Sequence, residues 1–581
     1  MNEATPDNVS EKRRQSSDAT DGRYWILLPI AAAVAYLILS THAARVETPT
    51  VDEFAHVPAG CAYWEHGRLD LYCKNPPLLK YWMALPVVLD ERADVPAITD
   101  PPWDWGPWKY GVRFMHANRA HYFDLFFRAR LMIVVLGLLT GVILFRWTAE
   151  LFNSRTASIV TSLFFLSPTV LAHAHLATTD VGCMFSVFWS VFTLRWAYKE
   201  PRWWRFLVAG AVLGLALSVK FTALVLLPLF VGLVVLYRWR STVRAGKHRA
   251  IAAVGDIGIL LASALLTVNL CMGLKGTWRP LDAYTFSSSF CKGVQRALPG
   301  PLPVPLPEDY VIGFDGQKMD AESGEFGGYL MGRWSQDGWW YYNLIALAVK
   351  LPVPFLVMIT IGVWLWFRGR MDGRERWAVP ASAAVFLVAL SLLSRLNLGI
   401  RYLLPGLPFL FILTGALWAR VLASPKRWLG MAPLAVVAYS CVVLAVVHPG
   451  YLSFFNVPAG GPDHGERWLV DSNLDWGQDL YRVREAVGPL VGDEPIRLLY
   501  FGHVDPGLYG IRYRPLLPYP TEDVIAVSMN YLVGNSYVVV GPDCEVLHVP
   551  RDYAKWLRAH TPVRRVGSIV IFDTRAVSQS K

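Results

Sequence analysis

Two acidic segments lie where long apolar stretches of the sequence end. The first, TPTVDEFAHVPAG, places Asp52 beside Glu53, with His56 one helical turn beyond Asp52. Adjacent carboxylates at the edge of a hydrocarbon layer raise each other's pKa, which suits them to accept a proton from a hydroxyl group or to bind that group. A structural alternative stays open, because an acidic pair at a helix amino terminus also stabilises the helix dipole.

The second acidic segment, HAHLATTDVGC, contains Asp180. An isolated Asp or Thr at such a place often caps the helix that follows, and this is the alternative to a catalytic role. His173 and His175 together with Asp180 could also form a metal site. On a helix, however, residues two apart point to different faces, so polar side chains lining a site are the other interpretation. The sequence leaves the metal question open.

Basic residues between the acids could bind an anion. In YCKNPPLLKYW, Pro76 and Pro77 stiffen the chain between Lys74 and Lys80, and Asn75 precedes the double proline. Such an exposed cationic loop can hold a phosphate or a lipid headgroup. Lysines that extend from an interfacial helix toward water would give the same pattern.

Three further cations, Lys220, Lys350 and Arg401, lie near the ends of apolar segments. A lipid-linked phosphate that leaves as an anion is stabilised by a positioned Lys or Arg. Basic residues beside a membrane span are costly unless they face a polar cavity or reach the interface, so both explanations hold for each of the three.

The composition predicts the elements that position these residues. The chain has 581 residues, 54% hydrophobic and 17% charged, with a mean hydropathy of +0.33. A soluble domain is nearer a quarter charged, so a soluble, disordered or fibrous protein is excluded. The apolar residues form eleven blocks of membrane-spanning length, although ten or twelve spans also fit. These blocks are residues 24–40, 131–148, 156–172, 181–197, 205–219, 221–237, 251–273, 343–367, 378–393, 402–419 and 428–447.

The charges between the blocks predict the topology. With the amino terminus in the cytoplasm, every predicted cytoplasmic connection is basic, as the positive-inside rule requires. The net charge of +10 is therefore a membrane signal, and we expect no nucleic-acid partner. Residues 44–127, 274–340 and 448–581 fall outside, and both acidic segments lie on this same face.

The hydropathy and charge patterns divide the chain into three predicted regions. Residues 1–23 are predicted to be a disordered cytoplasmic tail, and residues 24–447 the transmembrane domain, with long outer loops at 44–127 and 274–340. Residues 448–581 contain the strand-like runs IRLLYFG, VIAVSM, SYVVVG and SIVIFD, which predict a small α/β domain outside the membrane. In this tail, Asp471, Asp475 and Asp479 are interpreted as a loop followed by a helix cap.

The order of these motifs resembles a known family. A span, then DE, then an xPPLxK segment, then a TD acid before the fourth span is similar to glycosyltransferase family 39, which includes protein O-mannosyltransferases and lipid A aminoarabinose transferases of the GT-C superfamily. The segments LGLALSVKFTALV, GGYLMGRWSQDGWWYYNLIALAVKLPVP and LNLGIRYLLPGLPF resemble bacterial members. HPGYLSFFNVPAGGP and DSNLDWGQDL are similar to a bacterial subgroup with an extracytoplasmic tail, so that the resemblance covers most of residues 45–575.

The resemblance implies an all-α polytopic GT-C fold of about eleven spans with a small α/β domain, in a bacterial inner membrane. It implies transfer of a hexose or pentose, with inversion, from a polyprenyl-phosphate carrier to an acceptor glycan, lipid or protein. Asp52 matches the family's first acid, with Glu53 as its neighbour, and Asp180 matches the second. No cofactor is certain, since some relatives use a divalent metal ion and others do not.

One departure concerns the donor phosphate. Asn75 replaces the His or Lys that family members carry before the double proline, so the phosphate ligand is any of Lys74, Lys80, Lys220, Lys350 and Arg401, with His56, Asn75 and His175 as further lining residues. Two alternatives of other classes remain: a lipid or solute transporter, and a non-catalytic membrane scaffold. The sequence contains neither the paired repeats nor the matched broken helices that transporters commonly have.

Overall fold

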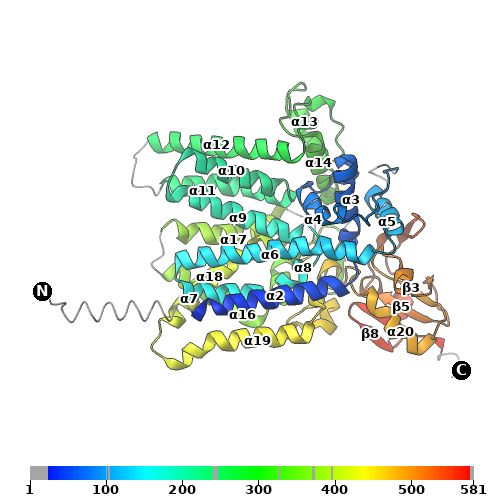
Figure 1. Cartoon of the computed structure of the whole chain (residues 1–581). Coiled ribbons are helices and arrows are strands. Elements are labelled where there is room, and N and C mark those ends of the chain that lie inside the picture. The colour runs from blue at the N-terminus through cyan, green and yellow to red at the C-terminus, as the bar shows by residue number, and fades with distance from the viewer. Residues whose placement is uncertain are drawn as a thin grey trace.

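A bundle of long, roughly parallel or antiparallel helices forms most of the molecule (Figure 1). The structure is a computed structural model, and it describes residues 24–99, 101, 105–239, 247–324, 327–369, 373–393 and 397–575. The expected tail of residues 1–23 lies outside the described residues. The bundle helices are α2 (Leu27–Val46), α6 (Tyr122–Leu151), α7 (Ser154–Phe165), α8 (Pro168–Ala174), α9 (Asp180–Lys199), α10 (Trp203–Leu217), α11 (Leu226–Trp239), α12 (Lys247–Cys271), α15 (Tyr342–Lys350), α16 (Val353–Arg368), α17 (Glu375–Leu393), α18 (Leu407–Leu422) and α19 (Ala432–Val447).

Each of the eleven apolar blocks coincides with one of these helices or with a broken pair of helices. Within the described ranges, six helices are long and apolar enough to cross a membrane, or up to eight if each of two bent pairs is one span. Helices α7 and α8 meet at 58°, and α15 and α16 at 118°. Pro168 and Pro352 stand at these two breaks, where a proline removes a helix hydrogen bond. The fold is therefore the mostly helical polytopic membrane protein that the sequence predicts.

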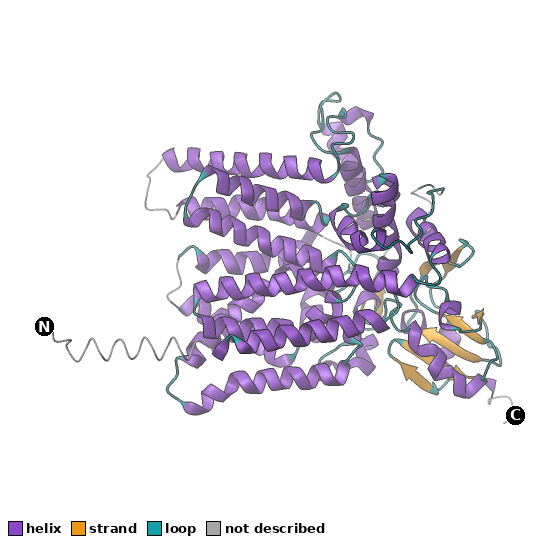
Figure 2. Ribbon diagram, in the orientation of Figure 1, coloured by secondary structure: helices purple, strands orange, loops and turns teal. Residues whose placement is uncertain are grey.

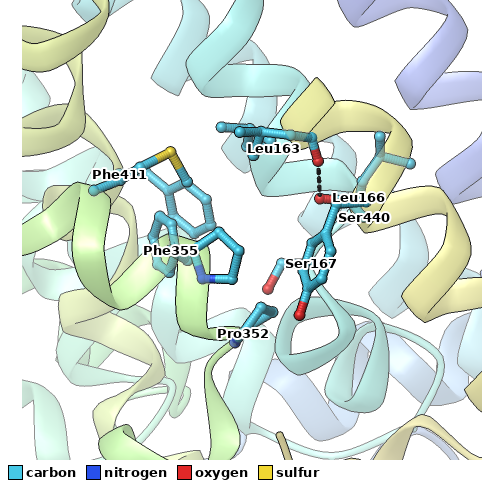
Figure 3. A pocket seen from close by; sticks show the side chains of 11 residues that line it. Leu163, Leu166, Ser167, Pro352, Phe355, Phe411 and Ser440 are labelled. Atoms are coloured by element: carbon cyan, nitrogen blue, oxygen red, sulfur yellow. Dashed lines mark hydrogen bonds between the residues drawn. The ribbon is translucent and has the colours of Figure 1, made fainter. Parts of the chain in front are cut away.

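A pocket lies between the two broken pairs. Figure 3 shows it among Leu163, Ser167, Pro352 and Phe355, with Ser440 on α19 forming another part of its wall. Its lining is mostly apolar and includes none of the acidic residues that the sequence singled out. It is therefore separate from the candidate site described below.

Short helices gather at one end of the bundle, the right-hand end in Figure 1. They come from the two expected outer loops; in this view α13 and α14 lie at the top, beside the end of α12, and α5 lies near the C-terminal sheet. The first loop forms α3 (Val51–His66), the 3-10 helix η1 (Leu69–Tyr72), α4 (Leu78–Val88) and α5 (Gly106–Ala117). The second forms η3 (Leu281–Ala283), α13 (Ser289–Ala297), α14 (Glu308–Ser323) and the hairpin β1 (Gly328–Leu330) with β2 (Arg333–Ser335).

The C-terminal tail forms a mixed sheet at the same end (Figure 2). Its order is β4-β3-β5-β9-β8, with β3 parallel to β4 and β5, and β9 antiparallel to β5 and β8. All four predicted strand runs form strands. The elements are β3 (Ile496–Leu499), β4 (Tyr513–Pro515), β5 (Val524–Ser528), β8 (Arg564–Val566) and β9 (Ile569–Asp573), a separate hairpin of β6 (Tyr537–Val540) and β7 (Val546–Val549), and the helices α20 (Val483–Val491) and α21 (Met529–Leu532).

Short 3-10 helices complete the chain. In the bundle they are η2 (Phe221–Val225), η4 (Ile400–Gly406) and η5 (Arg427–Met431). In the tail they are η6 (Tyr451–Ser453), η7 (Val457–Ala459), η8 (Pro462–Arg467), η9 (Asp471–Asn473), η10 (Leu480–Arg482), η11 (Pro506–Tyr509) and η12 (Lys555–Ala559).

Backbone hydrogen bonds join the tail to the bundle. The amides of Thr48 and Val51 donate to the carbonyl oxygens of Gln478 and Trp476, at 3.0 and 3.1 Å. These bonds place the tail loop directly against the first turn of α3, the turn that contains Asp52. The C-terminal domain is thus part of the surroundings of the first acidic segment.

Candidate active site

Asp52 forms an ion pair with Arg401. One Asp52 carboxylate oxygen lies 2.7 Å from an Arg401 terminal nitrogen, and the Asp52 side chain keeps 25% of its exposure. The guanidinium carbon of Arg401 also lies 4.5 Å from the centre of the Trp476 ring, a cation–π distance. Asp52 therefore has a partner from a segment far along the chain and can still be reached from outside.

The backbone before Arg401 depends on a glycine. Gly399 has φ +118°, a conformation that side chains other than glycine rarely adopt. A Cβ atom added there would lie 2.9 Å from side-chain atoms of Ser472 and Asn473. The Asn473 amide oxygen also accepts a hydrogen bond of 3.0 Å from the backbone amide of Ile400. The tail loop thus positions the short helix η4 that carries Arg401.

Asp180 forms a second ion pair, with Lys220. The Lys220 ammonium lies 2.6 Å from one Asp180 oxygen, and the Thr178 hydroxyl donates to the other at 3.1 Å. Both side chains of the ion pair are buried. The Lys220 nitrogen lies 4.6 Å from the centre of the Tyr402 ring, and the Arg401 guanidinium carbon lies 5.5 Å from the same centre. The two ion pairs therefore meet at Tyr402.

Glu53 points the other way, into a closed network. Arg130 donates to both of its carboxylate oxygens, at 2.7 and 2.8 Å. The amides of Thr50 and Ala177 donate to it at 2.9 and 2.6 Å. Burial raises the pKa of Glu53, but the charge and hydrogen bonds of Arg130 outweigh this and hold the pKa below its usual value. With its bonds so filled, Glu53 is placed to fix the start of α3, and the adjacent Asp52 alone faces the ion pairs.

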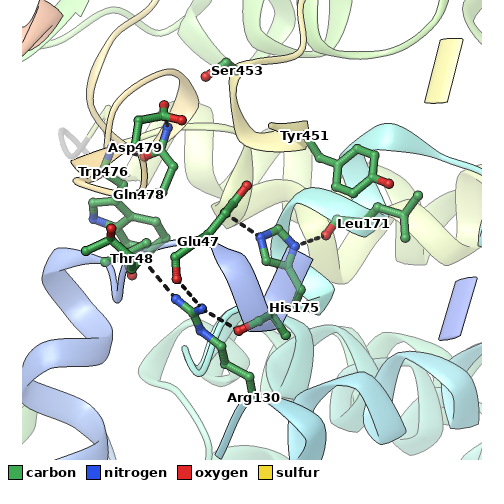
Figure 4. A network of polar contacts seen from close by, with 12 residues as sticks. Glu47, Thr48, Arg130, Leu171, His175, Tyr451, Ser453, Trp476, Gln478 and Asp479 are labelled. Carbon is green, nitrogen blue, oxygen red and sulfur yellow. Dashed lines mark hydrogen bonds and ion pairs between the residues drawn. The ribbon is translucent and has the colours of Figure 1, made fainter. Parts of the chain in front are cut away.

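His175 belongs to the same closed network. Its Nε2 lies 2.8 Å from Glu47 Oε2, and its Nδ1 lies 2.6 Å from the Leu171 carbonyl oxygen (Figure 4). That carbonyl oxygen can only accept, so Nδ1 donates the hydrogen. Arg130 also donates to the carbonyl oxygens of Glu47 and Thr48, as the dashed lines in Figure 4 show. Both nitrogens of His175 are therefore engaged in holding the chain that leads into α3.

The remaining three cations have other partners. Lys80 donates to the carbonyl oxygens of Tyr72 and Asn75, at 2.7 and 2.5 Å. Lys350 donates to the carbonyl oxygens of Leu452 and Asn473, at 2.8 and 2.7 Å, and is buried. Both therefore fix loop backbone.

Lys74 is 39% exposed and pairs with Asp320 at 2.8 Å. This places it at the rim of the site. Arg401 and Lys220 are the two expected phosphate ligands that the structure brings to the acids.

His56 and Asn75 carry buried polar atoms without a partner. Among the residues that the structure describes, neither ring nitrogen of His56 has a hydrogen-bond partner, and the Asn75 amide oxygen has none. Burial lowers the pKa of His56 to about 4, although Asp52 opposes the shift, so the ring is neutral at pH 7. Unpaired buried polar atoms cost free energy, which favours a polar ligand at this position.

The described residues contain no group of three His, Cys, Asp or Glu side chains placed to hold a metal ion. His173 lies near Asp180 without joining such a group, and both nitrogens of His175 are engaged. A divalent ion therefore stays a sequence-based expectation. All seven cysteines are free.

Sequence reasoning missed Arg130, and it interpreted Asp471 only as part of a loop before a helix cap, not as a neighbour of Arg401. Arg130 lies inside FFRARLMIVV at the start of an apolar block, and that placement is the signal that could have revealed it. Asp471 lies in the tail loop with φ +58°, a strained value for a residue with a side chain. Desolvation raises its pKa, whereas the nearby Arg401 charge opposes the rise. Its position follows from how the tail docks, which the sequence pattern does not contain.

Residues 123–267 match the family model described as dolichyl-phosphate-mannose-protein mannosyltransferase (PMT_2). The resemblance inferred from the motifs is thereby confirmed. The matched part of the chain, which contains Asp180 and Lys220, is similar to that family of membrane enzymes. No curated protein matches the chain.

Solved structures with similar folds include ArnT from Cupriavidus metallidurans in the apo state, with 14% identity over 94% of this chain and 97% of that chain and a TM-score of 0.44. ArnT bound to undecaprenyl phosphate matches at 13% identity over the same shares, with a TM-score of 0.43. The Archaeoglobus fulgidus oligosaccharyltransferase tethered to an acceptor peptide matches at 10% identity over 91% of this chain and 74% of that chain, with a TM-score of 0.45.

Proposed function

We propose that the chain transfers one sugar from a polyprenyl-phosphate donor to an acceptor hydroxyl, with inversion, at the site formed by Asp52, Arg401, Asp180 and Lys220. One observation carries this proposal: residues from four distant segments form two acid–base pairs that meet at Tyr402. A transferase needs a base for the acceptor and a cation for the leaving phosphate, and this cluster contains both.

The first pair supplies the base. Asp52 is the more exposed of the two site acids, and it lies on the first turn of α3, facing Arg401. A carboxylate paired with a guanidinium is a weak base. When a donor phosphate approaches Arg401 it competes with Asp52 for that cation. The carboxylate is then freed to accept the proton of the acceptor hydroxyl.

The transfer step then balances in atoms and charge. The acceptor oxygen forms a bond to the anomeric carbon as the bond from that carbon to the phosphate oxygen breaks. The hydroxyl proton moves to Asp52, and the bonding electrons leave with the polyprenyl phosphate, which gains one negative charge. Arg401 stabilises that charge on the leaving oxygen. Attack from the face opposite the phosphate inverts the configuration.

The second pair acts next to the first. Lys220 is buried against Asp180, and both are adjacent to Arg401 through the shared Tyr402 ring. A buried lysine keeps its charge most easily beside a carboxylate, so Asp180 maintains Lys220 as a cation. We assign Lys220 to the donor phosphate together with Arg401, and Asp180 to the positioning of Lys220.

The proposed orientation places this site outside the cytoplasm. In Figure 1 the ion pairs belong to elements at the right-hand end of the bundle, the end where α3, α4 and the sheet gather. The predicted cytoplasmic connections between helices lie at the opposite end and are basic. We therefore propose a bacterial inner membrane, with the amino terminus inside and the C-terminal domain outside.

Mass spectrometry of polyprenyl-linked sugars and surface glycans tests the proposal. Cells that lack the gene are compared with cells that carry the wild type, Asp52→Asn or the control Asp124→Asn, an exposed acid paired with Arg45. We expect donor to accumulate and product to disappear without the gene and with Asp52→Asn, while Asp124→Asn behaves as wild type. Normal product with a well-expressed Asp52→Asn protein overturns the mechanism. A loss seen only on removal of residues 450–581 supports the scaffold alternative, and movement of a lipid or solute without sugar transfer supports the transporter.

A further inference from the structure

An aromatic cluster extends from Asp52 into the C-terminal domain. It consists of His56, Tyr72, Trp108, His503 and Tyr537, and successive ring centres along it lie 5.3, 5.5, 6.4 and 6.2 Å apart. Its members come from α3, η1, α5, the loop after β3 and β6. The cluster is thus assembled by the first outer loop and the tail together.

His503 presents an unused hydrogen-bond donor in this cluster. Its Nδ1 accepts a hydrogen bond of 3.1 Å from the backbone amide of Val540. A neutral imidazole that accepts at Nδ1 carries its hydrogen on Nε2, and this Nε2 has no partner although the side chain is only 4% exposed. Burial lowers the pKa of His503 to about 4, so the neutral form holds at pH 7.

Two other members also have unused polar atoms. The Trp108 ring nitrogen, which can only donate, is buried and has no partner in the described part of the chain. His56 is buried with neither nitrogen paired, so its neutral ring offers one donor and one acceptor. Three donors and an acceptor are therefore left unsatisfied among aromatic faces. Each of these unpaired atoms destabilises the folded protein unless a ligand or a water molecule completes its hydrogen bond.

The chemistry of the cluster matches a pyranose ring. Sugar hydroxyls both donate and accept, and the C–H faces of a pyranose pack against aromatic rings, so one ligand satisfies both kinds of surface. A peptide acceptor also offers backbone carbonyl oxygens to these nitrogens, but its Ser or Thr side chain lacks the broad C–H face with which a pyranose packs against aromatic rings. The cluster therefore favours a carbohydrate.

The position of the cluster separates acceptor from donor. His56 lies among the charges of Asp52, Lys80, Asp180 and Lys220, whereas Asp52 is the one charged side chain that acts appreciably on His503. Arg401 acts on Tyr72 and Tyr537, so the cluster lies beside the ion pair of Asp52 and Arg401. Among the described residues, Asp52 acts on His503 and no cation does, which assigns His503 to the group that gives its proton to Asp52.

We infer that the aromatic cluster binds the acceptor, and that the acceptor nucleophile is a hydroxyl of a pyranose in a glycan or glycolipid. The inference rests on the proposed function, because it takes Asp52 as the base. It makes His503 and Trp108 specificity-determining residues supplied outside the four charged residues. The C-terminal domain thereby takes part in choosing the acceptor.

The test uses purified full-length protein and the polyprenyl-phosphate sugar extracted from cells lacking the gene. Two sets of acceptor probes are offered: nitrophenyl pyranosides of common hexoses and hexosamines, and peptides containing Ser and Thr. We expect transfer to at least one pyranoside and none to the peptides. Transfer to peptides alone overturns the inference while leaving the proposed function intact. Absence of any donor consumption, or full activity of Asp52→Asn, overturns the proposed function itself.

Paired substitutions at His503 sharpen the test. In His503→Asn the amide oxygen can replace Nδ1 toward Val540 but nothing replaces Nε2, whereas in His503→Gln the amide reaches the Nε2 position. We expect the Asn variant to raise the KM for the pyranoside about tenfold and the Gln variant to raise it less than threefold, with the KM for the donor unchanged in both. Trp108→Phe, which keeps an aromatic face but loses the N–H, should raise the same KM severalfold.

His560→Asn is the matched control, since His560 lies beside Trp556 outside the cluster. It should leave both KM values as in the wild type. An unchanged pyranoside KM in both His503→Asn and Trp108→Phe overturns the inference. A rise in the donor KM instead assigns the cluster to the donor sugar and overturns the acceptor assignment.

Discussion

Asp52 and Glu53 are neighbours in the sequence and lie in two different environments. Glu53 accepts hydrogen bonds from Arg130, Thr50 and Ala177 and is fully buried. Asp52 has one ionic partner, Arg401, and keeps a quarter of its side-chain exposure. A carboxylate whose bonds are all filled by protein stabilises a fold, whereas one with free capacity can exchange its partner for a substrate.

The same contrast holds for the surroundings of the two acids. Around Glu53, Arg130 ties together three loop carbonyl oxygens and both carboxylate oxygens. Around Asp52, both ring nitrogens of His56, the Trp108 ring nitrogen and Nε2 of His503 have no partner among the described residues. We call the first region the closed network and the second the open site. Residue type and spacing do not distinguish the closed network from the open site, since both regions contain an acid and an arginine.

Removing the open site's arginine should have the largest effect on activity. Arg401→Met removes the cation assigned to the leaving phosphate, and we expect the transfer rate to fall by about 10²- to 10³-fold. The melting temperature should change little, because the partly exposed Asp52 regains water. Initial rates with extracted donor measure the first effect and thermal unfolding in detergent the second. Arg401→Lys should recover part of the rate, and a fully active Arg401→Met variant would remove Arg401 from the mechanism.

Removing the closed network's arginine should instead have the largest effect on stability. Arg130→Met leaves the buried Glu53 carboxylate without its countercharge, which costs about 3–5 kcal/mol. Arg128, on the same helix, contacts Asp90 at 3.3 Å and is 47% exposed, so Arg128→Met should cost about 1 kcal/mol or less. Thermal unfolding of both variants gives the comparison. Equal melting temperatures would contradict the distinction between the two regions.

A substitution at the boundary should affect both properties. Gly399→Ala forces a side chain into a left-handed conformation against Asn473, at a cost of about 1–3 kcal/mol, and displaces the helix that carries Arg401. We expect a lower melting temperature together with about a tenfold lower rate. Gly430→Ala is the control, since a Cβ there meets nothing within 4 Å. A slower enzyme at unchanged stability would show that the glycine acts on the site alone.

Part of the fold and of the candidate site can be predicted from the sequence alone. The apolar blocks, the strands and the clustering of Asp52, Asp180, Lys220 and Arg401 at one end of the bundle follow from hydropathy, loop charge and motif order. The division of roles among the cations does not. Lys80 and Lys350 have the same local pattern as Lys220, and only the packed structure shows that both hold carbonyl oxygens. Glu53 likewise separates from Asp52 only because Arg130, 77 residues away, reaches it.

The way in which the C-terminal tail docks against the bundle is the clearest example of a feature that the sequence does not predict. His503 carries no motif, and Asp471 belongs to a motif whose role the sequence does not give. The chemistry of both residues depends on a loop docking against α3 through the amides of Thr48 and Val51. Such long-range pairings are set by the complementarity of folded surfaces, which one sequence without its fold does not display. For this reason the aromatic cluster could not be predicted from the sequence, although each strand near it was predicted.

The open site should also respond to acid. The pKa of His503 is lowered to about 4 by burial, while an unfolded chain has a His pKa near 6.5. Between these values the unfolded chain binds the extra proton, so stability is full above about pH 6.5 and falls as the pH drops toward 4. His503→Asn removes this group. Between pH 7 and pH 5, the free energy of unfolding of the variant should therefore fall by about 2 kcal/mol less than that of the wild type. Melting temperatures at both pH values measure it, and parallel losses would mean that His503 is protonated in the folded protein.

The smallest effect should come from Lys74, at the rim of the open site. Its side chain is 39% exposed and its partner is Asp320, so the pair contributes about 0–1 kcal/mol. If the donor phosphate is held by Arg401 and Lys220, Lys74→Ala should change the rate and the donor KM less than threefold. The sequence left Lys74 open as a phosphate ligand because it precedes the double proline. A large rise in the donor KM for Lys74→Ala would contradict this assignment. It would show that the donor phosphate binds beside Lys74 at the rim and not beside Arg401.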